Sequence, residues 1–167
     1  PEGVLFTSSS GSNSRSVAEH MLTSLLAVCR RLPAYRDSQR AHLWKDEGAM
    51  KTILGASVLV VGAGHVGSDF ARLCQGLGAR TIGLKRTASG PIEGFDQVRT
   101  MDELDSLLPQ ADVVALTLPH SPQTVRLMDE GRIARMKDDA VLISAGRGTV
   151  LDQDALVKAM TAGKLWG

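Results

Sequence analysis

The amino-acid sequence predicts an α/β fold, in which a doubly wound parallel sheet follows a long helix and breaks off before its last strands. Short runs of β-branched residues and leucine alternate with segments whose apolar residues recur at helical spacing. Such uninterrupted apolar runs are typical of parallel strands covered on both faces. With 167 residues, of which 43% are hydrophobic and 22% charged, the chain can bury one substantial core.

The segment before the first strand is expected to be largely helical. Residues 1–15 are rich in serine and glycine and predict a loop or linker, and residues 16–167 are expected to form the domain. Ser16, followed three residues later by Glu19, has the form of a capping box that would begin a helix with a broad apolar face. Pro33 should end that helix, and residues 34–44 predict a second, more polar helix that carries Trp44 toward a hydrophobic surface.

A nucleotide-binding turn is predicted after the first strand. The apolar run at residues 58–61 leads directly into a Gly-x-Gly-x-x-Gly sequence at Gly62, Gly64 and Gly67. Gly62 permits the tight turn, Gly64 lets backbone N–H groups approach a pyrophosphate, and Gly67 lets the following helix sit close to the sheet. A helix ending near residue 78 and a strand at 81–84 complete a βαβ unit. This context favours a Rossmann-type dinucleotide site over a merely tight turn.

The end of the second strand bears on the choice of cofactor. An acidic residue about 20 positions beyond the glycines normally binds the adenosine ribose hydroxyls of NAD. Here the sequence is Lys85-Arg86-Thr87, and two cations and a hydroxyl would instead attract a 2′-phosphate. We therefore predict that NADP is favoured over NAD. The alternative is that these are ordinary solvated cations at a strand end.

The remaining segments continue the alternation of strands and helices. In order, they predict a short strand near Val98, a helix from Asp102 capped by Thr100, a strand at 112–118, a helix at 129–136, a strand at 140–144, and a helix at 152–162 closed by Gly163. Cys29 and Cys74 fall on apolar helical faces, where a thiol behaves as a small hydrophobe.

Composition argues against several classes of protein. A formal net charge of +1 gives no reason to expect nucleic acid or an acidic membrane as partner. No apolar stretch is long enough to span a bilayer, and we expect neither a signal peptide nor a metal site. Two cysteines make no disulfide scaffold, which fits a reducing, cytoplasmic location.

Four segments together resemble the D-isomer-specific 2-hydroxyacid dehydrogenases, a family that includes phosphoglycerate dehydrogenase and glyoxylate/hydroxypyruvate reductase. They are Ser16-Val17-Ala18-Glu19-His20, the glycine turn, Leu118-Pro119-His120-Ser121-Pro122-Gln123-Thr124, and Ser144-Ala145-Gly146-Arg147-Gly148 with Val150-Leu151-Asp152 behind it. Their order and spacing match as well, and the resemblance covers residues 11–167.

The resemblance implies roles for individual residues. His65 and Val66 would lie at the pyrophosphate, and Ala145 and Gly146 near the nicotinamide; Leu118, Pro119 and Thr124 would lie on the adenosine side. Arg147 would be the catalytic arginine, because a guanidinium at the carboxyl end of a parallel strand can bind the carboxylate of a 2-oxo acid and polarise its ketone. The alternative is a surface arginine near a helix start.

The implied activity is hydride transfer between NAD(P)H and a small 2-oxo or 2-hydroxy acid, with D-stereospecificity. The family's catalytic histidine and glutamate and its substrate domain are expected outside these 167 residues, since none of the four histidines fits the role. We therefore expect this chain to bind cofactor without turnover. A homodimer through the first helix and Trp44 is also expected. The alternatives are a dinucleotide-sensing protein, like the corepressors that share this fold, and another branch of Rossmann dehydrogenases.

Overall fold

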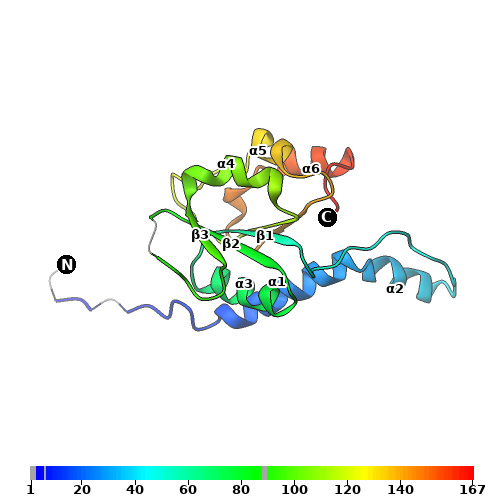
Figure 1. Cartoon of the computed structure of the whole chain (residues 1–167), viewed down its shortest axis with the longest axis horizontal. Coiled ribbons are helices and arrows are strands. Elements are labelled where there is room, and N and C mark those ends of the chain that lie inside the picture. The colour runs from blue at the N-terminus through cyan, green and yellow to red at the C-terminus, as the bar shows by residue number, and fades with distance from the viewer. Residues whose placement is uncertain (1–2, 6, 88–89) are drawn as a thin grey trace.

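The computed structural model describes residues 3–5, 7–87 and 90–167, and its centre is a five-stranded parallel sheet. The strand order is β3-β2-β1-β4-β5, so the chain moves outward from β1 first to one side and then to the other (Figure 1). The strands are β1 (Ser57–Val61), β2 (Arg80–Lys85), β3 (Gln97–Thr100), β4 (Val113–Leu116) and β5 (Val141–Ser144). The predicted doubly wound α/β fold is confirmed.

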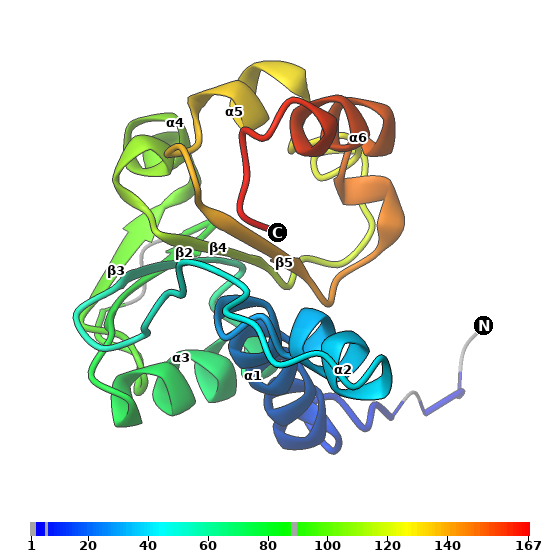
Figure 2. The same ribbon diagram turned by 90° about the vertical axis from the view of Figure 1, so that its right-hand side faces the viewer.

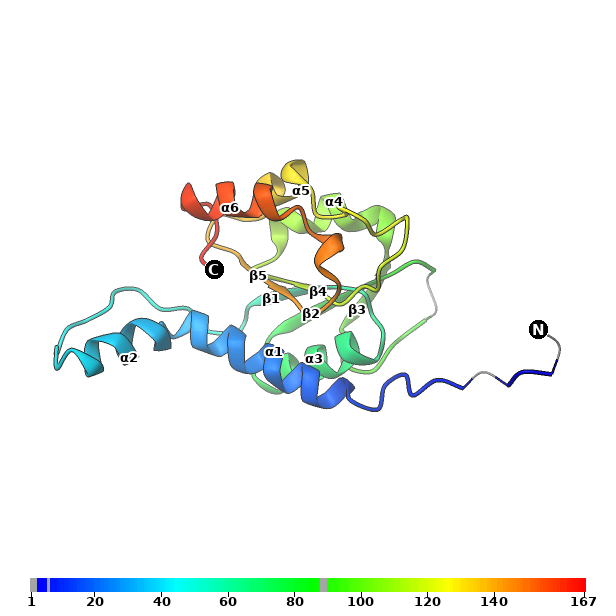
Figure 3. The same ribbon diagram turned by 180° about the vertical axis from the view of Figure 1, so that it is seen from behind.

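Helices cover both faces of the sheet, and Figure 2 shows the strands running between the two groups of helices. One layer contains α1 (Ser14–Cys29) and α3 (His65–Gly76). The other contains α4 (Leu104–Leu107), α5 (Glu130–Arg135) and α6 (Gln153–Thr161). Three short 3-10 turns, at Met101–Glu103, Leu108–Gln110 and Gly148–Val150, complete the connections. A further helix, α2 (Leu32–Arg40), extends away from the sheet beyond the end of α1 (Figure 3).

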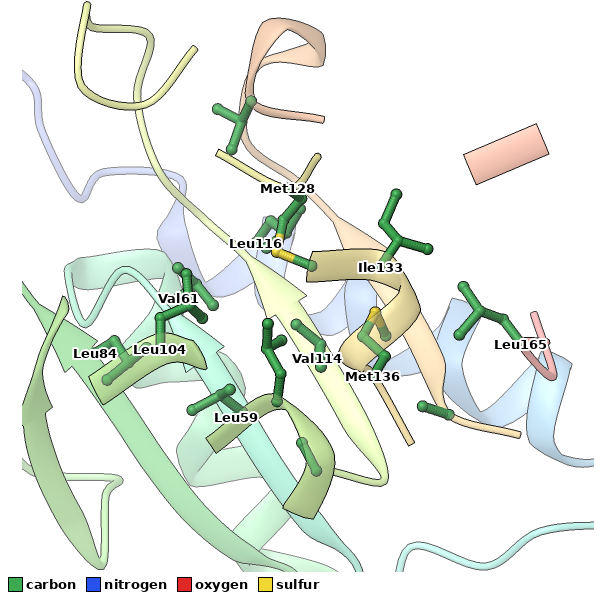
Figure 4. Close-up of a cluster of buried hydrophobic side chains, with 14 of the residues drawn as sticks. Leu59, Val61, Leu84, Leu104, Val114, Leu116, Met128, Ile133, Met136 and Leu165 are labelled. Atoms are coloured by element: carbon green, nitrogen blue, oxygen red, sulfur yellow. The ribbon is translucent and has the colours of Figure 1, made fainter. Parts of the chain in front are cut away.

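The alternation of side chains along β1 divides the core into two layers. Leu59 and Val61 point to the side of α4, α5 and α6, where they pack with leucines and methionines of those segments (Figure 4). Val58 and Val60 point to the other side, toward α1 and α3. Because both faces of this strand are buried, its sequence is apolar at every one of these positions.

Both cysteines lie in the layer between the sheet and the helices α1 and α3. Cys74 is fully buried against Phe70 and its neighbours, and burial raises the pKa of its thiol to about 12. The thiol therefore stays protonated and acts as a small apolar side chain, as the sequence predicted.

The predicted start of the first helix is wrong by two residues. α1 begins at Ser14, and Ser16 is exposed within its first turn, so Ser16 forms no capping box. The Ser14 side chain is instead buried and donates a hydrogen bond to a carboxylate oxygen of Asp69 in α3. A contact between two helices thus fixes the N-terminus of α1, where the sequence pattern pointed to a local cap.

Three other details differ from expectation. The predicted helix from Asp102 is a 3-10 turn followed by one α-helical turn and a second 3-10 turn, and Thr100 makes no side-chain cap. Pro33, which was expected to end the first helix, stands in the first turn of α2, where the N–H that proline lacks would have no partner within the helix. That helix ends at Arg40, and Trp44 is fully exposed instead of packed on this chain.

The last residues of the chain run beside β5. The Trp166 amide donates to the Ala140 carbonyl oxygen at 3.0 Å, and the Leu142 amide donates to the Gly167 carbonyl oxygen at 2.9 Å. These bonds continue the pairing pattern of the sheet past β5, as a sixth strand would. In the described part of the chain, no helix is long and apolar enough to cross a membrane.

Candidate functional site

A hollow of about 640 Å³ opens at the carboxyl ends of β1, β4 and β5. This is the place where strand order reverses, since β1 lies between β2 and β4, and ligands of doubly wound sheets bind at such points. Its lining includes residues of three segments that the sequence predicted, Gly64–Gly67, Leu118–Pro119 and Ala145–Arg147. It also includes Thr117 and the segment Ser8–Asn13, which were not predicted as parts of the site.

The three glycines of the turn have three different surroundings. Gly62 has a φ of +116°, which a residue with a side chain rarely adopts. A Cβ on Gly67 would lie 2.3 Å from the carbonyl oxygen of Gly62, so only glycine lets α3 approach the turn this closely. A Cβ on Gly64 would meet nothing within 4 Å, because this residue faces the open hollow. The backbone N–H groups at the start of α3 have no carbonyl within their own helix, and they begin at this open position.

The end of β2 lies directly beside the glycine turn. The amides of Gly62 and Ala63 both donate to the carbonyl oxygen of Leu84, at 3.0 and 2.9 Å. Lys85, the next residue, is half-buried at the end of the strand, and Arg86 and Thr87 are exposed beyond it. These three residues are outside the lining of the hollow and follow the strand end that lies beside the glycine turn.

The end of β5 is pressed against the end of β4. The amides of Ala145 and Gly146 both donate to the Leu116 carbonyl oxygen, at 3.0 and 3.1 Å. A Cβ on Gly146 would lie 2.6 Å from the Leu118 carbonyl oxygen, so this crossing also requires a glycine. The crossing places Arg147 on the wall of the hollow with an exposed side chain.

Thr124 has a structural role within its own loop. Its hydroxyl accepts a hydrogen bond from the Ser121 amide at 2.8 Å and donates to the Pro119 carbonyl oxygen at 2.7 Å. Thr124 is not part of the lining of the hollow. Its effect on the site is to hold the loop that carries Pro119 and Leu118.

The acidic group nearest in sequence to Arg147 is engaged elsewhere. The Asp152 carboxylate caps α6 by accepting from the Ala155 amide at 3.2 Å and forms an ion pair with Arg126. These backbone and side-chain hydrogen bonds lower the pKa of Asp152 below its ordinary value. Within residues 3–5, 7–87 and 90–167, no three histidine, cysteine or acidic side chains converge as metal ligands would.

Sequence reasoning missed two parts of the site. The serine-rich segment at residues 8–13 forms one wall of the hollow, and a Cβ on Gly11 would lie 3.1 Å from the His65 ring. Its composition, typical of linkers, gave no sign of this contact. The second is Thr117, whose hydroxyl lies under the glycine turn; a single threonine at a strand end carries no distinctive signal in a sequence.

Comparison with known proteins agrees with this geometry. A sequence model described as D-isomer specific 2-hydroxyacid dehydrogenase, NAD binding domain, matches residues 22–167. The chain belongs to this family. D-3-phosphoglycerate dehydrogenase of Haemophilus influenzae is 37% identical over 157 residues, which are 93% of this chain and 38% of that protein. The family expected from the sequence motifs is therefore confirmed.

Solved structures of the family have the same architecture. The phosphoglycerate dehydrogenase of Lactobacillus plantarum superposes with a TM-score of 0.86 at 28% identity, covering 98% of this chain and 53% of that one. The D-lactate dehydrogenase of Aquifex aeolicus, solved with NAD and lactic acid, gives a TM-score of 0.83 at 28% identity and covers 92% and 46%. This family member thus spans about half the length of those structures.

Proposed function

We propose that this chain is the cofactor-binding part of an oxidoreductase that transfers a hydride between NAD(P)H and a small 2-oxo or 2-hydroxy acid. One observation carries the proposal: the open side of the glycine turn and the Arg147 side chain share the wall of one hollow at the strand-order reversal. The turn offers backbone donors to a pyrophosphate, and the guanidinium offers a bidentate partner to a carboxylate.

The residues of this chain would divide the work by position. The N–H groups from His65 to Gly67 would hold the pyrophosphate, and the crossing of Ala145 and Gly146 over Leu118 would support the nicotinamide end. When bound, the cofactor supplies or accepts the hydride. Arg147 would anchor the substrate carboxylate and stabilise negative charge that develops on the ketone oxygen.

The preference for NADP is the finer part of the proposal. Lys85, Arg86 and Thr87 stand where β2 meets the glycine turn, which is where the adenosine ribose lies in this type of site. Cations there favour a 2′-phosphate, and a carboxylate, which would repel it, is absent from these three positions.

Calorimetric titration of the 167-residue chain with NADPH and NADH at fixed low salt tests both parts. Binding of either dinucleotide supports the site, and tighter binding of NADPH supports the preference. Lys85→Ala with Arg86→Ala should then weaken NADPH binding by about 1–3 kcal/mol and NADH binding far less. Removing two cations from the α5–α6 layer, Arg135→Ala with Lys158→Ala, makes the same change in net charge and should leave both affinities unchanged. Equal losses for the two cofactors would overturn the preference.

Self-association is a further part of the proposal. The arm formed by α2 and the return segment to residue 50 exposes four large apolar side chains: Leu32, Leu43, Trp44 and Met50. The arm also carries charges of both signs, Arg36, Asp37 and Arg40 in α2 and Lys45, Asp46 and Glu47 in the returning segment, which suits contact with a second copy of the same surface. The apolar face of the first helix, α1, from which a homodimer was expected, is buried in the core of this chain, whereas Trp44 is exposed. We therefore propose that this arm, which carries Trp44, pairs two copies of the chain.

A further inference from the structure

We infer that Thr117 is a positioning residue for the dinucleotide, acting through the glycine turn; the inference rests on the cofactor site proposed above. Thr117 is the first residue after β4, and its amide donates to the Val61 carbonyl oxygen at 3.0 Å. This bond continues the pairing of β4 with β1 and brings the threonine side chain under the turn that follows β1.

The hydroxyl of Thr117 occupies space that the glycines leave open. It donates a 2.7 Å hydrogen bond to the Gly62 carbonyl oxygen. A Cβ on Gly62 would lie 2.9 Å from this hydroxyl oxygen, and a Cβ on Gly67 would lie 3.0 Å from it. The hydroxyl is therefore enclosed by the first and third glycines of the motif.

The carbonyl that Thr117 contacts also sets the direction of the next peptides. The Gly64 amide donates to the same Gly62 oxygen at 2.8 Å. The N–H of that same peptide, on Ala63, donates to the Leu84 carbonyl oxygen at 2.9 Å, so the Thr117 hydroxyl makes one of three hydrogen bonds that fix the plane of the peptide after Gly62. That plane fixes the Gly64 amide and so determines where the open N–H groups from His65 onward point.

The two sides of the turn therefore differ in the groups that they present. The side that would face the phosphate is backbone only, and on the side that faces the sheet the Thr117 side chain adds one hydrogen bond to those of the Leu84 carbonyl oxygen. Loss of the Thr117 hydroxyl should leave the fold in place, because the Leu84 carbonyl oxygen still holds the Gly62 and Ala63 amides, and should loosen the orientation of the Gly62 carbonyl oxygen and of the Gly64 amide bonded to it. The effect then falls on ligands that touch the turn, by about three- to tenfold for one hydrogen bond.

The test compares Thr117→Val, which keeps the shape and removes the donor, with Thr117→Ser, which keeps the donor. We expect Thr117→Val to raise the dissociation constant for NADPH about three- to tenfold and to leave that for adenosine 2′-phosphate, which lacks the pyrophosphate, unchanged. Thr117→Ser should bind like the unaltered chain. Thr161→Val, which removes an exposed hydroxyl bonded to the Val157 carbonyl oxygen within α6, is the matched control and should change neither.

A ligand-free measurement separates this inference from the proposed function. Amide hydrogen exchange at Gly64 should be several-fold faster in Thr117→Val than in the unaltered chain or in Thr117→Ser. Faster exchange would support the role of the hydroxyl even if the chain bound no dinucleotide, an outcome that would count against the proposed function alone. Unchanged exchange together with unchanged NADPH affinity would overturn the inference. Equal weakening of NADPH and adenosine 2′-phosphate would also overturn it, because it would indicate a general loss of structure.

Discussion

At the scale of single residues, the glycine turn contains positions with opposite requirements. Gly67 has no room for a methyl group, since its Cβ would lie 2.3 Å from a carbonyl oxygen. Gly64 has extended backbone angles, φ −95° and ψ −165°, which any residue adopts, and open space on its side-chain side. The same motif therefore combines one glycine needed for packing with one that borders open space, where the proposed dinucleotide would approach.

Alanine at these two glycines should separate stability from binding. Gly67→Ala is expected to destabilise the fold by about 1–3 kcal/mol through overpacking. Gly64→Ala should leave the free energy of unfolding within about 0.5 kcal/mol and weaken dinucleotide binding at least about tenfold, because its methyl group would point at the pyrophosphate. Urea unfolding and calorimetric titration of both variants provide the check. Wild-type affinity in Gly64→Ala would contradict the placement of the phosphate.

The residue scale also shows what a sequence does and does not reveal. Gly62, Gly64 and Gly67 were assigned from the motif alone, and at Gly62 and Gly67 the structure shows a steric need that only glycine meets. Thr117 satisfies an equally specific need, but a hydroxyl can bond to many backbone groups and its partner lies 55 residues away in the sequence. Such a contact is a property of the sheet order, and no local pattern contains it.

At the scale of elements, helix ends were predicted well where the cap is local. Asp129 and Asp152 each accept a bond from an amide three residues on, and the helices α5 and α6 begin next to them. α1 is different because Ser14, its first residue, is held by Asp69 of another helix. The sequence placed the start at Ser16 since only a capping pattern was visible there.

Serine-to-alanine variants should show which residue fixes the start of α1. Ser14→Ala is expected to destabilise the chain by about 1–2 kcal/mol, because it removes a buried hydroxyl and leaves one Asp69 oxygen without its donor. Ser16→Ala, at an exposed position of the same turn, should change the free energy of unfolding by less than about 0.5 kcal/mol. Chemical denaturation of the two variants gives the answer. A larger loss of stability in Ser16→Ala than in Ser14→Ala would instead indicate that Ser16 caps the helix, as the sequence pattern predicted.

The cap of α6 should make its stability depend on pH. The pKa of Asp152 is lowered in the folded chain by the Ala155 amide and by Arg126, so the unfolded chain binds more protons than the folded one in the acidic range. The contribution is therefore complete above the ordinary carboxyl pKa of 3.8 and is lost as pH falls below it. Thermal unfolding of Asp152→Asn should show a lower Tm than the unaltered chain at pH 7 and a smaller gap near pH 3. If the difference in Tm between the two proteins were the same at pH 7 and pH 3, the charge of Asp152 would not account for its contribution to stability.

At the scale of the whole molecule, the arm is anchored where α1 ends and where the chain returns toward β1. Arg31 adopts a left-handed conformation with φ +52° between the two helices, and its Nε donates to the Ala49 carbonyl oxygen at 2.7 Å. Its guanidinium lies 4.6 Å from the centroid of the Trp166 ring, and the Lys51 ammonium lies 4.9 Å from it. Trp166 also donates to the Val28 carbonyl oxygen at 3.2 Å. The sheet edge next to β5 thus holds both ends of the arm.

This anchoring gives the exposed apolar side chains of the arm a fixed direction, which lowers the entropy lost when they meet a partner. We therefore expect sedimentation equilibrium to show a dimer, and Leu43→Asp with Trp44→Asp to shift it toward monomer because two charges would be buried without partners. Val157→Asp with Met160→Asp places two charges at exposed apolar positions of α6, on the other layer, and should leave the dimer intact. Trp166→Leu should weaken association without altering the contact surface, because it removes the ring contacts with Arg31 and Lys51 that hold the two ends of the arm. A monomeric unaltered chain, or equal loss of association in the arm and α6 variants, would exclude the arm as the surface that pairs two copies.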